Sequence, residues 1–180
     1  MTDRPLDILV LTDLHYIGAA DDVCTIEQRQ CDLGPALIQG AFRHLEQDGI
    51  RPDLLILLGD LVNDGLATGA EIDLTAIAQA AHDTGLPLLA VPGNHDGDAA
   101  RFATLFGCPP GLHEIGGYGF LIFHDRVALD HVTTRPAEGL VLPGETSRQH
   151  PDLPWMRGRR PCPGSHLLLA LRRASVPQTR

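Results

Sequence analysis

The sequence predicts an α/β fold in which three parallel strands alternate with helices. Three short apolar runs are continuous rather than alternating, which is typical of strands covered on both faces of a sheet. Helical patterns separate these runs, and the order strand, helix, strand, helix, strand implies right-handed crossovers in a parallel sheet. The chain of 180 residues suits one domain with a core of ordinary size.

The expected elements follow in order along the chain. Strands are expected at 6–11, "LDILVL", at 54–58, "LLILL", and at 86–91, "LPLLAV". Pro35 suits the first turn of a helix that runs to Gly49, and a second helix is expected over 68–83 with Gly85 as its stop. A short helix is expected over 99–106. A hairpin is expected over 118–132, with a tight turn at Asp125 and Arg126.

Composition and charge argue against several classes of protein. The chain is 43% apolar and 21% charged, which is typical of a soluble globular protein. Its net charge of −9 disfavours general attraction to nucleic acid or to an anionic membrane surface. No apolar run is long enough to cross a bilayer, and the N-terminus lacks a secretory pattern, so the cytoplasm is the expected location. The four cysteines form no CxxC, and reduced thiols are expected.

Each apolar run is followed by polar residues of a particular kind. "DLH" follows the first run, "GD" the second and "GNHD" the third. Functional sites in open α/β sheets form beyond the carboxyl ends of the strands, so these three motifs are expected to converge. Alternation along a strand would put Asp13 and His15 on the same side. Asp, His and Asn side chains are ligands that Mn, Fe and Zn accept, and a carboxylate can bridge two cations.

The three motifs together resemble the calcineurin-like metallophosphoesterase family. The family pattern is D-x-H, then G-D-x-x-N/D, then G-N-H-D/E, and this chain has "DLH" at 13–15, "GDLVN" at 59–63 and "GNHD" at 93–96. The stretch "GDLVNDG" is most similar to the branch related to cyclic-nucleotide phosphodiesterases. The resemblance covers about residues 6–132 and implies a metallophosphoesterase-like layered α/β sandwich.

The resemblance also implies a role for individual residues. Two divalent metal ions are expected, and their identity (Mn, Fe or Zn) is left open. The implied metal ligands are Asp13 and His15 on the first ion, Asp60 as the bridge, and Asn94 on the second ion. His95 is the implied catalytic residue, which would bind the phosphate and help protonate the leaving oxygen. Asn63 and Asp96 are expected to orient the ligands and His95.

The implied function is hydrolysis of phosphomonoesters or phosphodiesters by a metal-activated water. The expected substrate is a small phosphate ester or a nucleotide. A nucleotide-binding fold is disfavoured, because no glycine-rich phosphate-binding loop follows any of the strands.

The last thirty residues differ in kind from the rest of the chain. They hold six of the 14 basic residues, all of which are Arg, and one of the 23 acidic residues. The sequence therefore predicts a metallophosphoesterase-like domain over 1–150 and a basic, Pro- and Arg-rich, poorly ordered tail over 151–180.

The histidine motifs that the family carries later in the chain, "HHP" and "GHxH", are absent here. We therefore expect the C-terminal strands of the family fold to be missing, either through truncation or a frameshift near Trp155 or in a natural short variant. His124 and His131 follow strand patterns and are expected to be structural rather than ligands. The alternative function is a catalytically impaired homologue that acts at most as a metal- or partner-binding domain.

Overall fold

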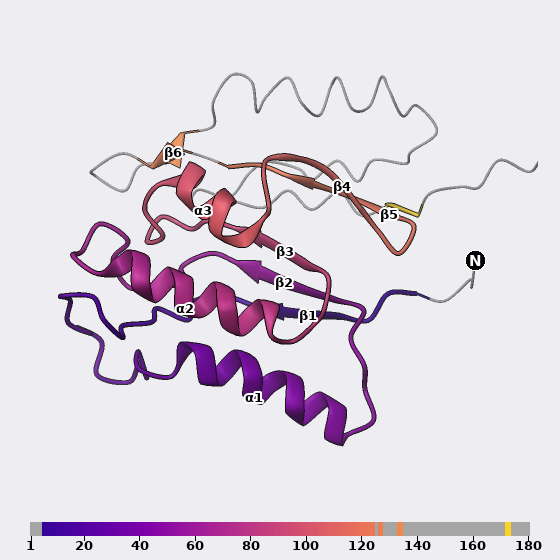
Figure 1. The fold of residues 1–180 in the computed structure, drawn as a ribbon, viewed down its shortest axis with the longest axis horizontal. Coiled ribbons are helices and arrows are strands. Elements are labelled where there is room, and N and C mark those ends of the chain that lie inside the picture. The colour runs from indigo at the N-terminus through magenta and orange to yellow at the C-terminus, as the bar shows by residue number, and fades with distance from the viewer. Residues whose placement is uncertain (1–4, 125, 128–132, 135–171, 174–180) are drawn as a thin grey trace, which may run out of the picture.

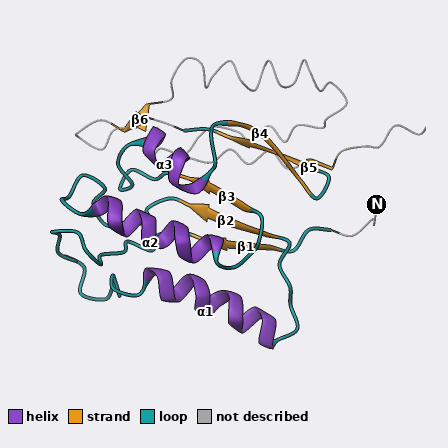
Figure 2. Ribbon diagram, in the orientation of Figure 1, coloured by secondary structure: helices purple, strands orange, loops and turns teal. Residues whose placement is uncertain are grey.

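Three helices pack in succession beside a parallel sheet in a computed structural model of the chain, which describes residues 5–124, 126–127, 133–134 and 172–173. The sheet consists of β1 (Ile8–Leu11), β2 (Leu54–Leu58) and β3 (Leu88–Val91). The helices are α1 (Gly34–Gln47), α2 (Ala70–His82) and α3 (Ala99–Phe106). Helix α1 packs on α2, α2 on α3, and α3 on β3 (Figures 1 and 2).

The parallel sheet confirms the predicted α/β fold. Its order is β1-β2-β3, with Ile8 opposite Leu54 and Leu55 opposite Leu88. The central strand β2 is the most buried, because the sheet and the helices leave its continuous apolar run no exposed face. All three carboxyl ends therefore lie at one edge of the sheet.

The helix ends follow local signals that the sequence contains. Pro35 occupies the first turn of α1, where the missing N–H costs nothing. Asp98 caps α3 by accepting a hydrogen bond from the N–H of Arg101 at 2.8 Å. Gly107 ends the same helix with a φ of 65°.

The predicted hairpin over 118–132 is wrong in its position. The structure forms an antiparallel hairpin from β4 (Gly111–Ile115) and β5 (Tyr118–Ile122), which lies beyond α3 in Figure 1. Gly116 and Gly117 make its turn with φ values of 59° and 83°, which glycine adopts without strain. The strand at Arg126–Val127 (β6) pairs with Thr133–Thr134 (β7) and not with β5.

Little of the predicted tail belongs to the described residues. Arg172–Arg173 forms a short strand, β8, which pairs antiparallel with β5. The rest of the tail, like His131, lies outside the described residues, and the domain boundary at 150 stays a prediction.

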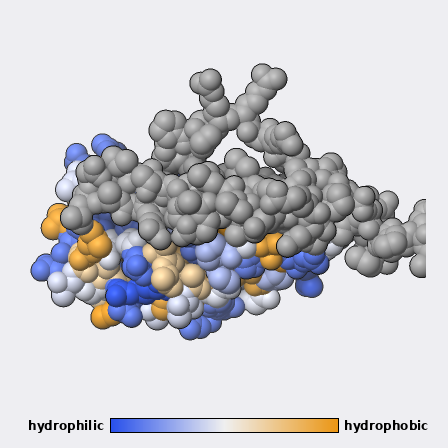
Figure 3. Space-filling model, turned by 90° about the horizontal axis from the view of Figure 1, so that it is seen from above, coloured by the Kyte–Doolittle hydropathy of each residue, from blue (hydrophilic) through white to orange (hydrophobic). Residues whose placement is uncertain are grey.

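One core joins the parallel sheet to the sheet that contains β5. The side chains of β2 and β3, of α2 and α3, and of Phe120 and Ile122 on β5 form a single buried cluster. The exposed large apolar residues are spread over different elements, such as Val10 on β1 and Leu37 on α1. On the face drawn in Figure 3, strongly hydrophobic residues appear as separate orange spots among hydrophilic ones. None of the described helices has the length and apolar character needed to cross a membrane.

The prediction of reduced thiols is wrong for one pair of cysteines. Cys24 and Cys31 form a disulfide within the loop between β1 and α1. Their spacing has no motif of its own, and they meet because the loop folds back, with the N–H of Ile17 donating to the carbonyl of Cys31 at 2.7 Å. Cys108 is a buried free thiol, and Cys162 lies outside the described residues.

Candidate metal centre

The segments that follow β1 and β2 remain hydrogen-bonded beyond the ends of the strands. The N–H of Asp13 donates to the carbonyl of Gly59 at 3.1 Å, and the N–H of His15 donates to the carbonyl of Asp60 at 2.9 Å. Tyr16 then forms an isolated parallel bridge with Val62. These bonds fix the backbone of the "DLH" motif against that of the "GD" motif.

An unusual backbone conformation marks the same three positions. Asp13, His15 and Asp60 have φ values of 56°, 43° and 52°, and they are the described non-glycine residues with positive φ. Such conformations cost free energy and persist at functional sites, where the surrounding structure imposes them. Strand β1 ends at Leu11, so this turn of the backbone, rather than the alternation that the sequence predicted, brings Asp13 and His15 together.

Close approach of β2 and β3 depends on two glycines. A Cβ on Gly59 would lie 2.7 Å from the Cα of Gly93, and a Cβ on Gly93 would overlap the backbone and carboxylate of Asp60. The absence of a side chain at these two positions therefore lets the two backbones approach closely. It places "GNHD" directly beside Asp60.

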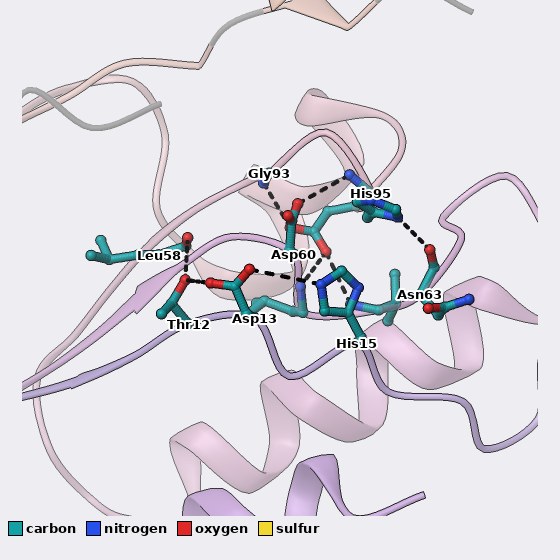
Figure 4. Close-up of polar contacts among 11 residues, drawn as sticks. Thr12, Asp13, His15, Leu58, Asp60, Asn63, Gly93 and His95 are labelled. Carbon is teal, nitrogen blue, oxygen red and sulfur yellow. Dashed lines mark hydrogen bonds and ion pairs between the residues drawn. The ribbon is translucent and has the colours of Figure 1, made fainter. Parts of the chain in front are cut away.

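Asp13, His15 and Asp60 are brought together as a candidate metal site (Figure 4). One ligand atom from each of them lies within 4.8 Å of those of the other two. Metal–ligand bonds of about 2.0–2.2 Å set this scale, since ligands on either side of one ion are separated by about twice that length. Nδ1 of His15 is buried and lacks a hydrogen-bond partner among the described residues. The donor set of two carboxylates and one imidazole fits a divalent ion.

Burial favours the form of His15 that binds metals. Its side chain is 2% exposed, and this burial lowers the pKa of its imidazole below the usual value, aided by the nearby charges of Arg29 and His95. A neutral imidazole has the lone pair that a metal ligand requires. A neutral His15 could therefore coordinate a cation, and its Nε2 faces the cluster, 3.7 Å from Oδ1 of Asp13.

The two carboxylates of the cluster, those of Asp13 and Asp60, remain accessible to solvent. The side chain of Asp13 is 61% exposed, and the hydroxyl of Thr12 lies 2.6 Å from its Oδ2 and 3.0 Å from the carbonyl of Leu58. Asp60 is half-buried, and its Oδ1 accepts a hydrogen bond from the N–H of His95 at 3.3 Å. An ion could therefore reach both carboxylates from the solvent side.

Asp96 joins the loops that follow β2 and β3. Its fully buried carboxylate accepts hydrogen bonds from the N–H groups of Leu61 at 2.7 Å, Val62 at 3.1 Å and Gly93 at 2.7 Å. Burial raises the pKa of Asp96 to about 6, although these three bonds favour the charged form. Asp96 thus holds the backbone around Asp60. The sequence predicted that Asp96 orients the ligands and His95.

His95 is positioned beside the cluster by its contacts on both sides. Its ring meets that of His15 edge to face, with centroids 4.8 Å apart. Its Nδ1 lies 2.6 Å from the main-chain carbonyl of Asn63. Asn94 is half-buried and stands between Gly93 and His95, both of which contact Asp60.

His124, which the sequence predicted to be structural, contacts the core. Its ring packs edge to face on that of Phe102, with centroids 6.4 Å apart. Phe102 is a fully buried residue of α3, so this contact fits a structural role.

Two carboxylates that hold the loop after "DLH" are not predicted by the sequence. Asp73 on α2 is 1% exposed and accepts hydrogen bonds from three consecutive N–H groups, at 2.6–3.1 Å; the donors are Gly18, Ala19 and Ala20. Asp22 accepts a hydrogen bond from Nδ2 of Asn63 at 2.8 Å. Neither carboxylate belongs to a motif, and only the folded loop shows what it contacts.

Comparison with known proteins agrees with the motifs. The sequence model of the family described as calcineurin-like phosphoesterase matches residues 6–171. A probable cyclic nucleotide phosphodiesterase from Psychrobacter arcticus is 33% identical over 98 residues, which make up 52% of this chain and 32% of that protein. The chain thus spans about a third of the length of this relative.

A solved structure is also similar to part of the chain. It is a dimetal phosphatase from Danio rerio, with 16% sequence identity and a TM-score of 0.38. The similarity covers 52% of this chain and 31% of the phosphatase.

Proposed function

The chain belongs to the calcineurin-like phosphoesterase family, and from this premise we propose that it is a metal-dependent phosphoesterase with a binuclear centre. The observation that supports the proposal best is the cluster of Asp13, His15 and Asp60, whose ligand atoms lie within 4.8 Å of one another. Three motifs far apart in the sequence supply this site and its surroundings, at the edge of the sheet where α/β enzymes bind their ligands.

We propose that Asp13 and His15 hold the first ion, that Asp60 bridges both ions, and that Asn94 holds the second. Bound divalent ions would neutralise the charge of a phosphoryl group and make water a nucleophile at neutral pH. Asp60 suits the bridge because its carboxylate has two oxygen atoms, and because the segments that follow β1 and β3 both donate hydrogen bonds to this residue. Asn94 adds no negative charge, which keeps the site attractive to an anion.

We propose that His95 is the general acid. The carbonyl of Asn63 can only accept a hydrogen bond, so Nδ1 of His95 carries the proton in their 2.6 Å contact. A second proton on Nε2 then makes the imidazolium that donates to the leaving oxygen. His95→Ala is expected to lower turnover while leaving the metal content nearly unchanged, because His95 is not a ligand.

The proposed substrates are phosphodiesters of nucleotides, with other phosphoesters as the broader class. The similarity to a probable cyclic nucleotide phosphodiesterase supports this choice. The net charge of −9 favours a small substrate held by metals over a long polyanion.

The decisive experiment measures hydrolysis of bis-p-nitrophenyl phosphate and of cyclic nucleotides with added Mn²⁺, Fe²⁺ or Zn²⁺, beside elemental analysis of the same protein. Turnover that requires metal and falls in Asp60→Ala supports the proposal. Absence of turnover, with less than one tightly bound metal per chain, would reject it.

One observation favours a second candidate function. In the part of the chain that the structure describes, the cluster of carboxylates and imidazole has three members, which could hold one metal ion. A catalytically impaired homologue that binds one metal without turnover fits this cluster as well. One tightly bound metal per chain together with no hydrolysis of any of these substrates would identify that function.

A further inference from the structure

Asn63 is held in place by three hydrogen bonds to two other parts of the chain. Its N–H donates to the carbonyl of Tyr16 at 3.2 Å, and its Nδ2 donates to Oδ2 of Asp22 at 2.8 Å. Its carbonyl accepts the bond from Nδ1 of His95 at 2.6 Å. Two of these bonds come from the loop that follows β1. The third joins Asn63 to His95, the proposed general acid, and Figure 4 shows this contact.

We propose that Asp22 is a positioning residue for His95, which acts by holding Asn63 so that its main-chain carbonyl faces Nδ1 of His95. The proposal rests on the proposed function of His95 as the general acid. Asp22 does not touch His95. It fixes the side chain of the residue whose carbonyl selects the tautomer and the ring orientation of His95.

The loop that carries Asp22 is itself anchored on both sides. Before Asp22, the N–H groups of residues 18–20 donate to the buried carboxylate of Asp73, and the N–H of Asp21 donates to the carbonyl of Thr68 at 2.8 Å. After Asp22, the disulfide between Cys24 and Cys31 closes the loop. Because the loop is held in this way, the carboxylate of Asp22 has a defined position and can determine where the side chain of Asn63 lies.

The charge of Asp22 strengthens this contact. A hydrogen bond to an ionised acceptor is stronger and shorter than one between neutral groups, and both partners here are partly buried. Asp22 therefore affects His95 by fixing the position of Asn63. The neutral side chain of Asn63 brings no charge of its own near His95. Residues that orient a functional histidine in this indirect way commonly change metal affinity or activity by about 10–100-fold when they are replaced.

Three variants separate positioning from simple bracing of the loop. Asp22→Ala removes the acceptor, whereas Asp22→Asn keeps an oxygen that can accept the bond from Asn63. Asp21→Ala is the matched control, because it removes the same charge from the exposed neighbouring side chain. Urea denaturation of each variant establishes that the comparison is made between folded proteins.

The first measurement does not depend on turnover. Long-range nitrogen NMR spectra of ring-labelled histidine distinguish the Nδ1–H from the Nε2–H tautomer, with His95→Gln used to assign the signal. We expect His95 to have Nδ1–H in the original protein, in Asp21→Ala and in Asp22→Asn, and to shift toward Nε2–H in Asp22→Ala. An unchanged tautomer in folded Asp22→Ala would overturn the proposal.

The second measurement compares leaving groups. A general acid matters more for an alkyl ester than for a nitrophenyl ester, whose leaving group needs little protonation. We expect Asp22→Ala to lose about tenfold in kcat on the alkyl ester and a smaller factor on the nitrophenyl ester, and to keep its metal content. Equal losses on both esters would also overturn the proposal.

The two measurements distinguish failure of this proposal from failure of the proposed function. A tautomer shift in a protein without turnover supports the role of Asp22 and rejects catalysis by the chain. Turnover with an unchanged tautomer in Asp22→Ala supports catalysis and rejects the role of Asp22.

Discussion

The two ends of the parallel sheet are built in different ways. At the amino end, Asp7 and Asp53 exchange hydrogen bonds of 2.9 and 2.7 Å between neighbouring segments of extended chain. At the carboxyl end, Asp13 and Asp60 adopt positive φ, and the buried Asp96 binds three backbone N–H groups. Unfavourable backbone conformations and a buried carboxylate thus occur together at the carboxyl end. Both features are typical of functional sites.

The largest expected effect tests the buried carboxylate of the carboxyl end. Asp96→Ala leaves three buried N–H groups without an acceptor, and we expect a loss of about 3–5 kcal/mol in the free energy of unfolding. Asp53→Ala at the amino end is expected to lose about 1 kcal/mol. Urea denaturation measures both, and equal losses would contradict the difference between the two ends.

The next effect tests the close approach of the strands. Gly59→Ala adds a methyl group that meets Gly93 at a φ of 73°, and we expect a loss of about 2–4 kcal/mol from strain and overpacking together. Gly85 is the control, because it has a φ of 68° and nothing lies within 4 Å of the position that an added methyl group would take. Gly85→Ala should cost about 1 kcal/mol, since strain alone acts there. Similar losses would show that packing at the carboxyl end is looser than described.

Metal binding tests the chemical purpose of the carboxyl end. Asp60→Ala is expected to weaken metal binding about 100-fold, or about 2.7 kcal/mol, because Asp60 is proposed to bridge both ions. Asn94→Ala should lose about tenfold, because Asn94 is proposed to hold one ion only. Elemental analysis after dialysis gives the metal content per chain. Equal losses in the two variants would reject Asp60 as the bridge.

The smallest expected effect concerns the buried thiol of Cys108, which follows α3 in the sequence and belongs to none of the three motifs. Burial raises the pKa of its thiol above the ordinary value of 9.0, so the folded state holds the proton more tightly than the unfolded chain. Its contribution to stability is therefore constant below about pH 9 and falls as the pH rises through the raised pKa. In a Cys162→Ser background, alkylation by iodoacetamide at pH 8 should be slow in the folded protein and rapid in urea. Equal rates would show that the thiol is accessible.

Local pattern in the sequence predicts much of the fold. The apolar runs predict β2 with its observed bounds, but they start β1 and β3 two residues too early, since the structure starts them at Ile8 and Leu88. The glycines at 116–117 contain a hairpin signal that the prediction misses, because it takes the apolar run after them as the first strand of the pair.

Features of the candidate site that depend on tertiary structure could not be predicted. The motifs predict the cluster of Asp13, His15 and Asp60, but not the positive φ values that form it. The contact of Asn63 with His95 goes through the main chain, which no side-chain pattern reveals. Asp22 and Asp73 act through a loop whose path depends on contacts far apart in the sequence.

The anchor that Asp73 provides has a consequence for how this protein can diversify. Its carboxylate binds peptide N–H groups at Ala19 and Ala20, so the identity of those two side chains is irrelevant to the anchor. Gly18 differs, because a Cβ there would collide with the ring of Tyr16. A combinatorial library at positions 19 and 20 could therefore vary the side chains of this loop while the backbone that Asp73 holds stays unaltered.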